Sequence, residues 1–476
     1  MTALWTAPAL AAALGAETPA GAADLTGLSI DTRTLQRGDL FVALKDVRDG
    51  HDFVRNAFAA GAGAALVDRA HAGEIAGAGP LYVVEAVLPA LEKLGRAARA
   101  RSCARIVAVT GSVGKTSTKE MLRTVLGAQG ETHASVASYN NHWGVPLTLA
   151  RMAASARFGV FEIGMNHSFE IVPLTAMVRA HAAIVTTVEP VHLAQFPGIE
   201  AIADAKGEIF SGLLPGGVAV LNRDNPQFDR LKAHAAASPA GRIVTFGVQA
   251  GADARLIDVA CDADGSDVTA TVLGVPVRYR LGAPGRHMVQ NSLGVLAVAH
   301  VLGADVPAAA AAMADVAPAE GRGKRLLLET GAGPITLLDE AYNANSASMR
   351  AALAVLSTLP TGKNGRRIAV LGDMLELGAA GPALHAGLAE AVEEAGLDLV
   401  FAAGPLMKNL FDALPKARQG GYAADSAALE PMVLAALRGG DVVTVKGSNG
   451  SRMARIVTAL KTRYPAAGGA EEGRGV

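Results

Sequence analysis

The chain has 476 residues, of which 50% are hydrophobic and 18% are charged, and its formal net charge at pH 7 is −1. At roughly 150 residues per domain, this length predicts about three domains, and the composition is that of a compact globular protein. Nothing in this near-neutral charge argues for the basic stripe with which a nucleic-acid-binding surface neutralises phosphates. We therefore expect no nucleic-acid partner.

The two cysteines, Cys103 and Cys261, lie far apart and outside any CxxC or Cys/His spacing. This argues against a disulfide framework or a structural zinc site and fits a protein of the reducing cytoplasm. The apolar segment 1–17 lacks a basic n-region and is interrupted by Pro8, so it predicts a short helix rather than a signal peptide. No apolar run approaches the roughly 20 residues that span a bilayer, so no membrane insertion is expected.

The order of strand-like and helical segments predicts three α/β domains. Residues 1–103 contain short strand-like runs such as GDLFVAL and PLYVVE between helical ones, which predicts a small mixed α/β domain. Residues 104–316 alternate apolar strands with helices, which is typical of a parallel sheet, and residues 253–281 predict an antiparallel extension of it. Residues 317–476 repeat the alternation and predict a Rossmann-like α/β domain.

The motif TGSVGKT connects the strand RIVAV to the helical run TKEMLRTVL. Its glycines let backbone N–H groups point at phosphate oxygens, while Lys115 can neutralise phosphate charge and the Thr116 hydroxyl can hold Mg²⁺. The motif predicts binding of ATP or GTP and leaves the reaction open. The nucleotide-binding residues predicted here are Thr110, Gly111, Ser112, Val113, Gly114, Lys115 and Thr116.

This form of the loop resembles that of the Mur ligases and the related folylpolyglutamate synthases. The resemblance implies that the γ-phosphoryl group of ATP is transferred to a substrate carboxylate. An amine then displaces phosphate from the resulting acyl phosphate. Because a carboxylate must approach a triphosphate, such a site needs several cations in a closed pocket. The second domain is accordingly expected to be a P-loop ATPase domain with a parallel sheet.

Further residues of the central domain fit a magnesium site. Glu162 ends the strand VFEIG, at the edge where open α/β sheets bind ligands. The resemblance implies that Glu162 and His192 bind Mg²⁺ and that Lys206, in AIADAKGEIF, is carbamylated by CO₂. Only a neutral amine takes up CO₂, and burial readily lowers the pKa of a lysine. We thus expect Lys115, Glu162, His192 and Lys206 to be catalytic, with Thr116 joining the last three around the metal.

Nucleotide contacts from outside the P-loop are also implied by the resemblance. Asn291 is expected at the adenine, Arg322 at an ATP phosphate, and Asp339 at the ribose or the closing interface. Groups from a second domain would hold ATP fully only when the domains close, which excludes water from a hydrolysable acyl phosphate.

The runs DEAYNANSAS, LGDMLELG and VKGSNGSRM resemble the branch of the family that joins D-alanyl-D-alanine to UDP-N-acetylmuramoyl-tripeptide in peptidoglycan synthesis. The segment that begins IDTRTLQRGDLFVAL resembles the family's UDP-sugar-binding domain, and the third domain is expected to present the amine. A monomer is expected. The substrate-binding residues implied are Asp31, Thr32, Arg33, Asn140, Asn141, Tyr342, Asn343, Asn345 and Lys446.

Two alternative functions remain open at this stage. A folylpolyglutamate synthase-like ligase would lack the uridine-nucleotide domain, so residues 24–61 discriminate against it. A non-catalytic P-loop nucleotide switch would leave Glu162, His192 and Lys206 without a role.

Overall fold

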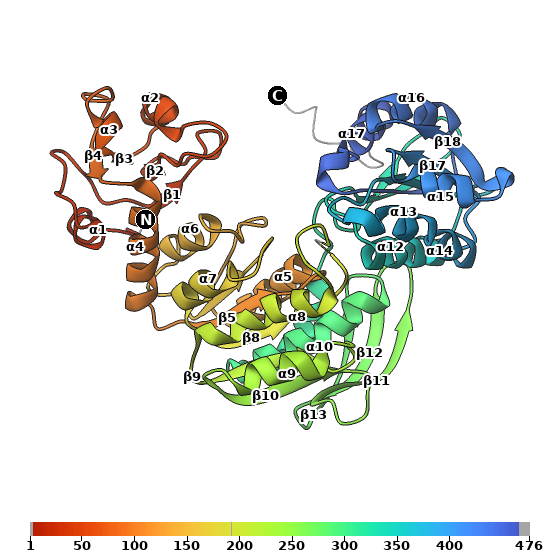
Figure 1. The fold of residues 1–476 in the computed structure, drawn as a ribbon, viewed down its shortest axis with the longest axis horizontal. Coiled ribbons are helices and arrows are strands. Elements are labelled where there is room, and N and C mark those ends of the chain that lie inside the picture. The colour runs from red at the N-terminus through yellow and green to blue at the C-terminus, as the bar shows by residue number, and fades with distance from the viewer. Residues whose placement is uncertain (1–2, 192, 466–476) are drawn as a thin grey trace, which may run out of the picture.

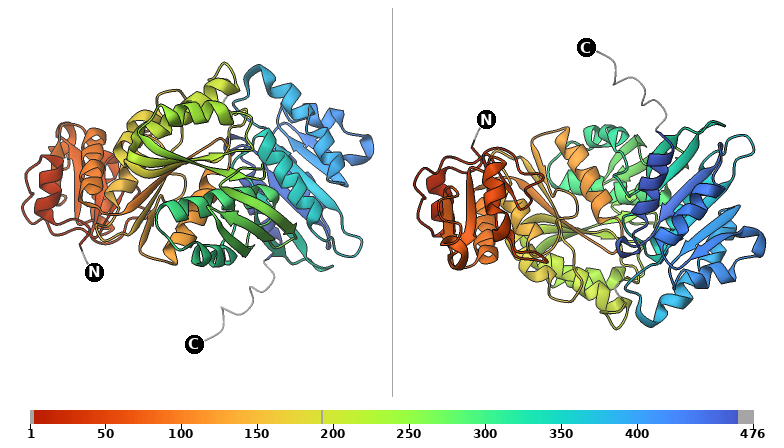
Figure 2. Two further views of the ribbon diagram at one scale, coloured as in Figure 1. Left: turned by 90° about the horizontal axis from the view of Figure 1, so that it is seen from below. Right: turned by 90° about the horizontal axis from the view of Figure 1, so that it is seen from above.

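The computed structural model describes residues 3–191 and 193–465 as three α/β units arranged along the chain (Figure 1). The first and last units lie at opposite ends of the long axis, with the central one between them (Figure 2). Within the described residues, no helix is both long enough and apolar enough to cross a membrane. Cys103 and Cys261 are both free and exposed.

The N-terminal unit is a parallel sheet of strand order β1-β2-β3-β4, covered by helices. The short helix expected near the N-terminus is confirmed as α1, which begins after the Thr6 cap and ends at Gly15 in the left-handed conformation. The strands are β1 (Gly27–Ser29), β2 (Asp39–Val42), β3 (Ala64–Asp68) and β4 (Leu81–Val84), and the helices are α1 (Ala7–Leu14), η1 (Gly50–Phe53), α2 (Val54–Ala59), α3 (Arg69–Ala72) and α4 (Val87–Arg101).

The central unit has a sheet of order β13-β12-β11-β10-β9-β8-β5-β7-β6. Strands β5 to β11 are parallel, while β12 and β13 pair antiparallel, as predicted for residues 253–281. The strands are β5 (Arg105–Thr110), β6 (Thr132–Ala134), β7 (Phe158–Glu162), β8 (Ala180–Val185), β9 (Leu213–Asn222), β10 (Ala240–Gly247), β11 (Ala254–Cys261), β12 (Ser266–Val272) and β13 (Val275–Leu281). The helices are α5 (Lys115–Gly127), α6 (Gly144–Ala150), α7 (Ile171–Val178), α8 (Ile199–Gly207), η2 (Glu208–Gly212), α9 (Phe228–Ala236), α10 (Arg286–Val301), α11 (Val306–Ala311) and η3 (Ala312–Asp315).

Strand β5 lies inside this sheet and is buried on both faces. Val107 and Val109 belong to the core on one face, and Ile106 and Ala108 to the core on the other. This two-residue alternation between two apolar layers explains why the strand reads as a continuous apolar run. Since β7 and β8 flank β5 in parallel, the carboxyl ends of the three strands meet at one edge of the sheet.

The C-terminal unit has a sheet of order β14-β15-β19-β16-β17-β18, in which only β14 pairs antiparallel among the strands that the structure describes. The strands are β14 (Lys324–Leu328), β15 (Ile335–Glu340), β16 (Arg367–Gly372), β17 (Leu399–Ala403), β18 (Gln419–Ala423) and β19 (Val442–Lys446). The helices are α12 (Ser346–Thr358), η4 (Gly378–Ala380), α13 (Gly381–Ala386), α14 (Ala389–Glu394), α15 (Lys408–Ala413), η5 (Lys416–Arg418), α16 (Ser426–Ala436), η6 (Asn449–Ser451) and α17 (Ala454–Arg463).

Both outer units make direct contacts with the central unit. At the N-terminal side α4 packs against α6, the Trp5 indole donates to the Ala150 carbonyl at 2.9 Å, and Arg151 Nε donates to the Leu28 carbonyl at 2.8 Å. At the C-terminal side the Ala194 N–H donates to the Glu376 carbonyl at 3.1 Å. Residues of separate units are therefore held close enough to share a site.

Asp441 is expected to be a main source of stability in the C-terminal unit. Its carboxylate is fully buried and accepts hydrogen bonds from Arg366 Nη2 at 2.7 Å and from the backbone N–H groups of Arg366 and Arg438. Asp441→Ala leaves a charge and two N–H groups without their acceptor. We expect it to lower the free energy of unfolding by about 3–5 kcal/mol in urea titrations. Asp412→Ala, which breaks an exposed pair with Lys408, is the matched control and should shift the midpoint little. Equal shifts for both variants would contradict the prediction.

Candidate active site

The phosphate-binding loop lies between β5 and α5, and its two glycines are required by close contacts. Gly111 has a φ of +150°, and a β-carbon there would collide with Thr186 Oγ1. Gly114 has a φ of +84°, and a β-carbon would lie 2.8 Å from the side-chain nitrogen of Asn291. The loop therefore keeps a backbone shape that other residues resist, directly beside Asn291.

Lys115 and Thr116 begin α5 and face the neighbouring strand end. The Lys115 ammonium donates to the Gly111 carbonyl at 2.8 Å. Thr116 Oγ1 donates to Glu162 Oε2 at 3.0 Å, and Asn140 Nδ2 donates to Glu162 Oε1 at 2.7 Å. Burial lowers the pKa of Lys115, while the charge of Glu162 opposes that change. A hydroxyl and a buried carboxylate side by side are the hard oxygen donors that suit Mg²⁺.

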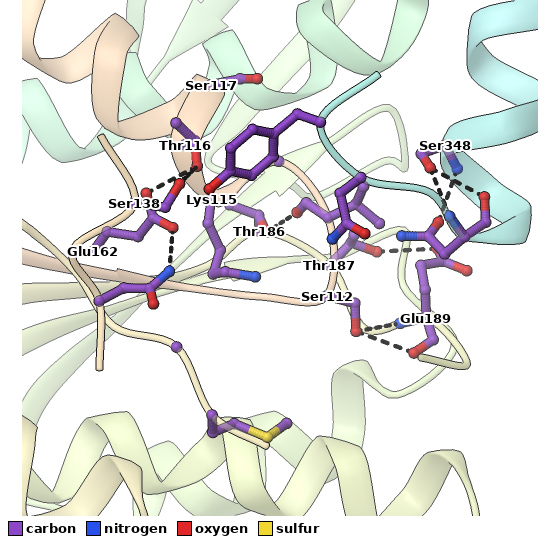
Figure 3. Close-up of a pocket in the computed structure, with 18 of the residues that line it drawn as sticks. Ser112, Lys115, Thr116, Ser117, Ser138, Glu162, Thr186, Thr187, Glu189 and Ser348 are labelled. Carbon is purple, nitrogen blue, oxygen red and sulfur yellow. Dashed lines mark hydrogen bonds between the residues drawn. The ribbon is translucent and has the colours of Figure 1, made fainter. Parts of the chain in front are cut away.

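A loop over residues 135–141 forms one wall beside Thr116, and Lys119 holds it. The fully buried ammonium of Lys119 donates to the carbonyls of Ser135 at 2.8 Å and Ala137 at 2.6 Å. The next residue, Ser138, lies 3.5 Å from Thr116 Oγ1 (Figure 3). Asn141 Oδ1 accepts the N–H of Gly144, the first residue of α6, at 2.9 Å.

Lys206 lies near the C-terminus of α8 and is only 2% exposed. Burial holds its pKa well below the usual range, and the charge of Lys115 lowers it further. In the described part of the chain, Lys206 Nζ forms no hydrogen bond or ion pair. His192, predicted as a metal ligand, lies outside the described residues.

The C-terminal unit reaches this site through Arg322. Its Nη2 donates to Ser138 Oγ at 3.2 Å, and its guanidinium lies 4.2 Å from the centre of the Tyr342 ring. Asp339 is buried behind it and accepts the N–H groups of Gly321 and Ala341, each at 3.2 Å. Asp339 thus supports the turn that carries Arg322 and does not itself line the cavity.

Lys446 fixes the adjacent loop of the same unit. It is 3% exposed and donates to Glu340 Oε2 at 3.1 Å and to the Asn343 carbonyl at 2.9 Å. Asn345 caps α12 by accepting the Ser348 N–H at 2.9 Å. These side chains shape the loop between β15 and α12 as well as facing the cavity.

A cavity of about 1020 Å³ connects these groups, and residues from all three units line it. Of the residues predicted from the sequence, those on its wall are Ser112, Val113, Gly114, Lys115, Thr116, Asn140, Asn141, Glu162, Asn291, Arg322, Tyr342, Asn343, Asn345 and Lys446. Those elsewhere in the described structure are Asp31, Thr32, Arg33, Thr110, Gly111, Lys206 and Asp339.

The residues off the wall differ in their surroundings. Thr110 is buried at the end of β5, behind the loop, and Gly111 carries the carbonyl that Lys115 contacts. Asp31 and Arg33 follow β1 and form an ion pair of 2.6 Å, with the Arg33 side chain 82% exposed. The hydrogen bond from Arg33 lowers the pKa of Asp31. The structure does not bring the Asp31 segment to the cavity wall.

Sequence reasoning missed several residues of the cavity wall. Phe169 follows β7 with a φ of +68°, is 77% exposed, and donates its N–H to Glu208 Oε1 at 2.7 Å. His287, which the sequence spacing places on the helix face of Asn291 without assigning it a role, lines the cavity one helical turn before Asn291, and burial lowers its pKa. Glu189 lies beside Ser112. Positive φ in a phenylalanine has no sequence signature, whereas Glu189 in TTVEPVH could have been noticed as an acid near the P-loop.

This geometry defines a class of protein: a three-unit α/β enzyme in which a P-loop and a strand-end carboxylate meet cations from another domain. Family models match along the chain and agree with that class. They are described as "Mur ligase family, catalytic domain" (residues 24–106), "Mur ligase middle domain" (109–299) and "Mur ligase, glutamate ligase domain" (324–449).

Individual relatives give the same result. A UDP-N-acetylmuramoyl-tripeptide–D-alanyl-D-alanine ligase from Escherichia coli is 36% identical over 444 residues, which cover 92% of this chain and 95% of the relative. The ligase of the same name from Bacillus subtilis is 32% identical over 447 residues, which cover 91% of this chain and 93% of the relative. A MurF crystal structure from Acinetobacter baumannii has a TM-score of 0.81 at 27% identity, covering 96% of this chain and 99% of that one. A MurF ligase from Thermotoga maritima in complex with ADP has a TM-score of 0.73 at 25% identity, covering 92% and 98%. The chain belongs to the Mur ligase family.

Lys115→Ala is expected to abolish turnover without unfolding the protein. The side chain is the P-loop cation, and among the described residues it donates one hydrogen bond, to the Gly111 carbonyl. Loss of a cation at a transferring phosphoryl group lowers kcat by about 100-fold or more. Phosphate release at saturating ATP measures the effect. Lys232→Ala, an exposed lysine on α9, is the control. Turnover of Lys115→Ala at the unaltered rate would rule out the P-loop assignment.

Proposed function

We propose that this chain is an ATP-dependent ligase that joins D-alanyl-D-alanine to UDP-N-acetylmuramoyl-tripeptide in peptidoglycan precursor synthesis. The observation that carries the proposal is the shared cavity, in which Lys115 of the central unit and Arg322 of the C-terminal unit face one space. Relatives that are named as ligases of these two substrates match more than nine-tenths of the chain. A cytoplasmic location, expected from the sequence, remains a prediction.

The chemistry follows from the charges in the cavity. The acceptor carboxylate attacks the γ-phosphorus of ATP, the bond to the bridging oxygen breaks, and ADP leaves. The neutral amine then attacks the acyl carbon of the acyl phosphate and loses a proton, and phosphate leaves with the electron pair of the C–O bond. Lys115 and Arg322 stabilise the negative charge on the transferred phosphoryl group. Mg²⁺, for which Thr116 and Glu162 offer oxygen ligands and His192 a nitrogen, would add positive charge at the phosphate oxygens.

The units divide the substrates between them in this proposal. The N-terminal unit binds the uridine nucleotide through Asp31, Thr32 and Arg33, which places the peptide toward the loop of Asn140 and Asn141. The nucleotide base of ATP lies beside Asn291, and Asp339 acts by holding the Arg322 turn. The C-terminal unit presents the dipeptide near the residues Tyr342, Asn343, Asn345 and Lys446.

We further propose that Lys206 is carbamylated. A buried ammonium without an anionic partner is unfavourable, and burial accordingly lowers the pKa of Lys206. The neutral amine adds to CO₂ and releases a proton, which gives an anionic carbamate. That anion has two advantages over the ammonium: it is compatible with the nearby Lys115 charge, and its oxygens can help to hold Mg²⁺.

Substrate specificity tests the proposed reaction. With ATP, Mg²⁺, D-alanyl-D-alanine and UDP-N-acetylmuramoyl-tripeptide, the enzyme is expected to form a product whose mass equals the sum of both substrates less one water. Free D-glutamate or L-lysine with shorter acceptors should give no product, because the loop between β15 and α12 is expected to fit the dipeptide. Efficient ligation of a free amino acid would assign the chain to another step. ATP binding without any ligation would favour the nucleotide switch.

Lys206→Arg separates the carbamate from a plain cation. Arginine keeps a positive charge and cannot take up CO₂, so kcat is expected to fall by about 100-fold or more. An independent readout is the carbamate carbon signal in ¹³C NMR after equilibration with ¹³C-bicarbonate, present in the unaltered enzyme and absent in the variant. Lys232→Arg on α9 controls for the substitution itself. An unaltered rate in Lys206→Arg would show that the carbamate is not needed.

A further inference from the structure

The turn after β8 carries a carboxylate to the edge of the phosphate-binding loop. The Ser112 N–H donates to the Thr187 carbonyl at 2.8 Å. Ser112 Oγ donates to the Glu189 carbonyl at 3.1 Å and accepts the Glu189 N–H at 2.9 Å. Two hydrogen bonds thus fix the backbone of Glu189 relative to the P-loop, and a third fixes Thr187 two residues earlier.

The Glu189 side chain faces the cavity with little compensation for its charge. Within the described structure its Oε1 accepts one hydrogen bond, from Thr187 Oγ1 at 3.3 Å, and Thr187 Oγ1 in turn accepts Asn225 Nδ2 at 2.8 Å. Among the described residues no cation lies within ion-pair distance of Glu189. Burial raises the pKa of its carboxyl group, as expected for a carboxylate removed from water without a cation.

Other carboxylates near the catalytic groups already have partners. Glu162 accepts Thr116 and Asn140, and Glu340 is paired with Lys446. A carboxylate beside a triphosphate site repels the phosphates unless a cation arrives with the substrates. Glu189 is therefore a site for a cationic group of a substrate or for a metal ion.

The position of Glu189 favours a substrate cation over Mg²⁺. In Figure 3, Thr116 and Glu162 lie on one side of Lys115, and Ser112 and Glu189 lie on the other. Ser348, in the first turn of α12, also lines the cavity. Helix α12 belongs to the C-terminal unit, which is proposed to present the amine substrate. The oxygen ligands that suit Mg²⁺ are thus separated from Glu189 by the P-loop lysine.

We propose that the Glu189 carboxylate binds the ammonium group of the incoming amine substrate. The inference rests on the proposed function, in which that substrate is D-alanyl-D-alanine. The dipeptide enters as a zwitterion, and an ion pair with Glu189 orients its nitrogen toward the P-loop side of the cavity, where the acyl phosphate forms. The pair also neutralises the carboxylate while phosphates occupy the loop.

Glu189→Gln tests the proposal, because the amide keeps the size of the side chain and can still accept the Thr187 hydroxyl. The KM for D-alanyl-D-alanine is expected to rise by about 10- to 100-fold, the range for losing a hydrogen bond to a charged group. The KM values for ATP and for the UDP-linked acceptor should stay within about twofold. Glu189→Asp should recover part of the loss. Glu394→Gln, which removes an exposed charge from α14, is the matched control.

A ligand lacking the ammonium isolates the interaction. D-lactoyl-D-alanine carries a hydroxyl in its place, and its inhibition constant against the dipeptide should be nearly equal in the unaltered enzyme and in Glu189→Gln. An unchanged KM for the dipeptide would overturn the inference. So would a higher Mg²⁺ requirement at unchanged amine KM, which would assign the carboxylate to the metal. If the unaltered enzyme fails to ligate the dipeptide at all, the proposed function itself is wrong.

Discussion

The hydrogen bond between Thr116 and Glu162 is the contact on which the arrangement of the site depends. Val109 of β5 and Glu162 of β7 are register partners, so the strand-end carboxylate lies level with the start of the phosphate loop. The hydrogen bond of 3.0 Å then joins the first turn of α5 to β7, the strand beside β5 in the sheet. Since β5 is buried on both faces, this joint cannot shift without disturbing two cores.

Arg322 of the C-terminal unit reaches the site through a loop attached to this joint. Ser138 lies next to Thr116 and accepts Arg322, so the loop over residues 135–141 connects the P-loop to the C-terminal unit. Lys119 holds that loop by its carbonyls, and it does so from the same helix that carries Thr116. A single helix therefore sets both the nucleotide-binding groups and the wall against which the neighbouring unit docks.

The sequence predicted the fold well because its strongest signals are local. The apolar run at Arg105–Thr110, the alternation in 253–281 and the turn residues of the P-loop each determine their own element. The sequence predicted side chains that reach the cavity wall where a motif places them at the start of a helix or the end of a strand, as for Lys115 and Glu162. Prediction was weaker for side chains that also have a structural role: Asp339 supports a turn, Asn141 accepts the first N–H of α6, and Asn345 caps α12. Phe169 and Lys119 depend on loop conformations that no residue pattern encodes.

The distribution of charge explains why the site is divided between units. Lys115 and Lys206 are close enough for the charge of one to lower the pKa of the other, and Arg322 lowers the pKa of Lys115 in the same way. Lys115 and Arg322, which belong to different units, repel each other and would favour an open arrangement of the units until anions enter. Phosphates and the acceptor carboxylate reverse that balance, since each anion interacts favourably with cations from both units. Closure thereby becomes a consequence of binding the substrates, and water is excluded when the acyl phosphate forms.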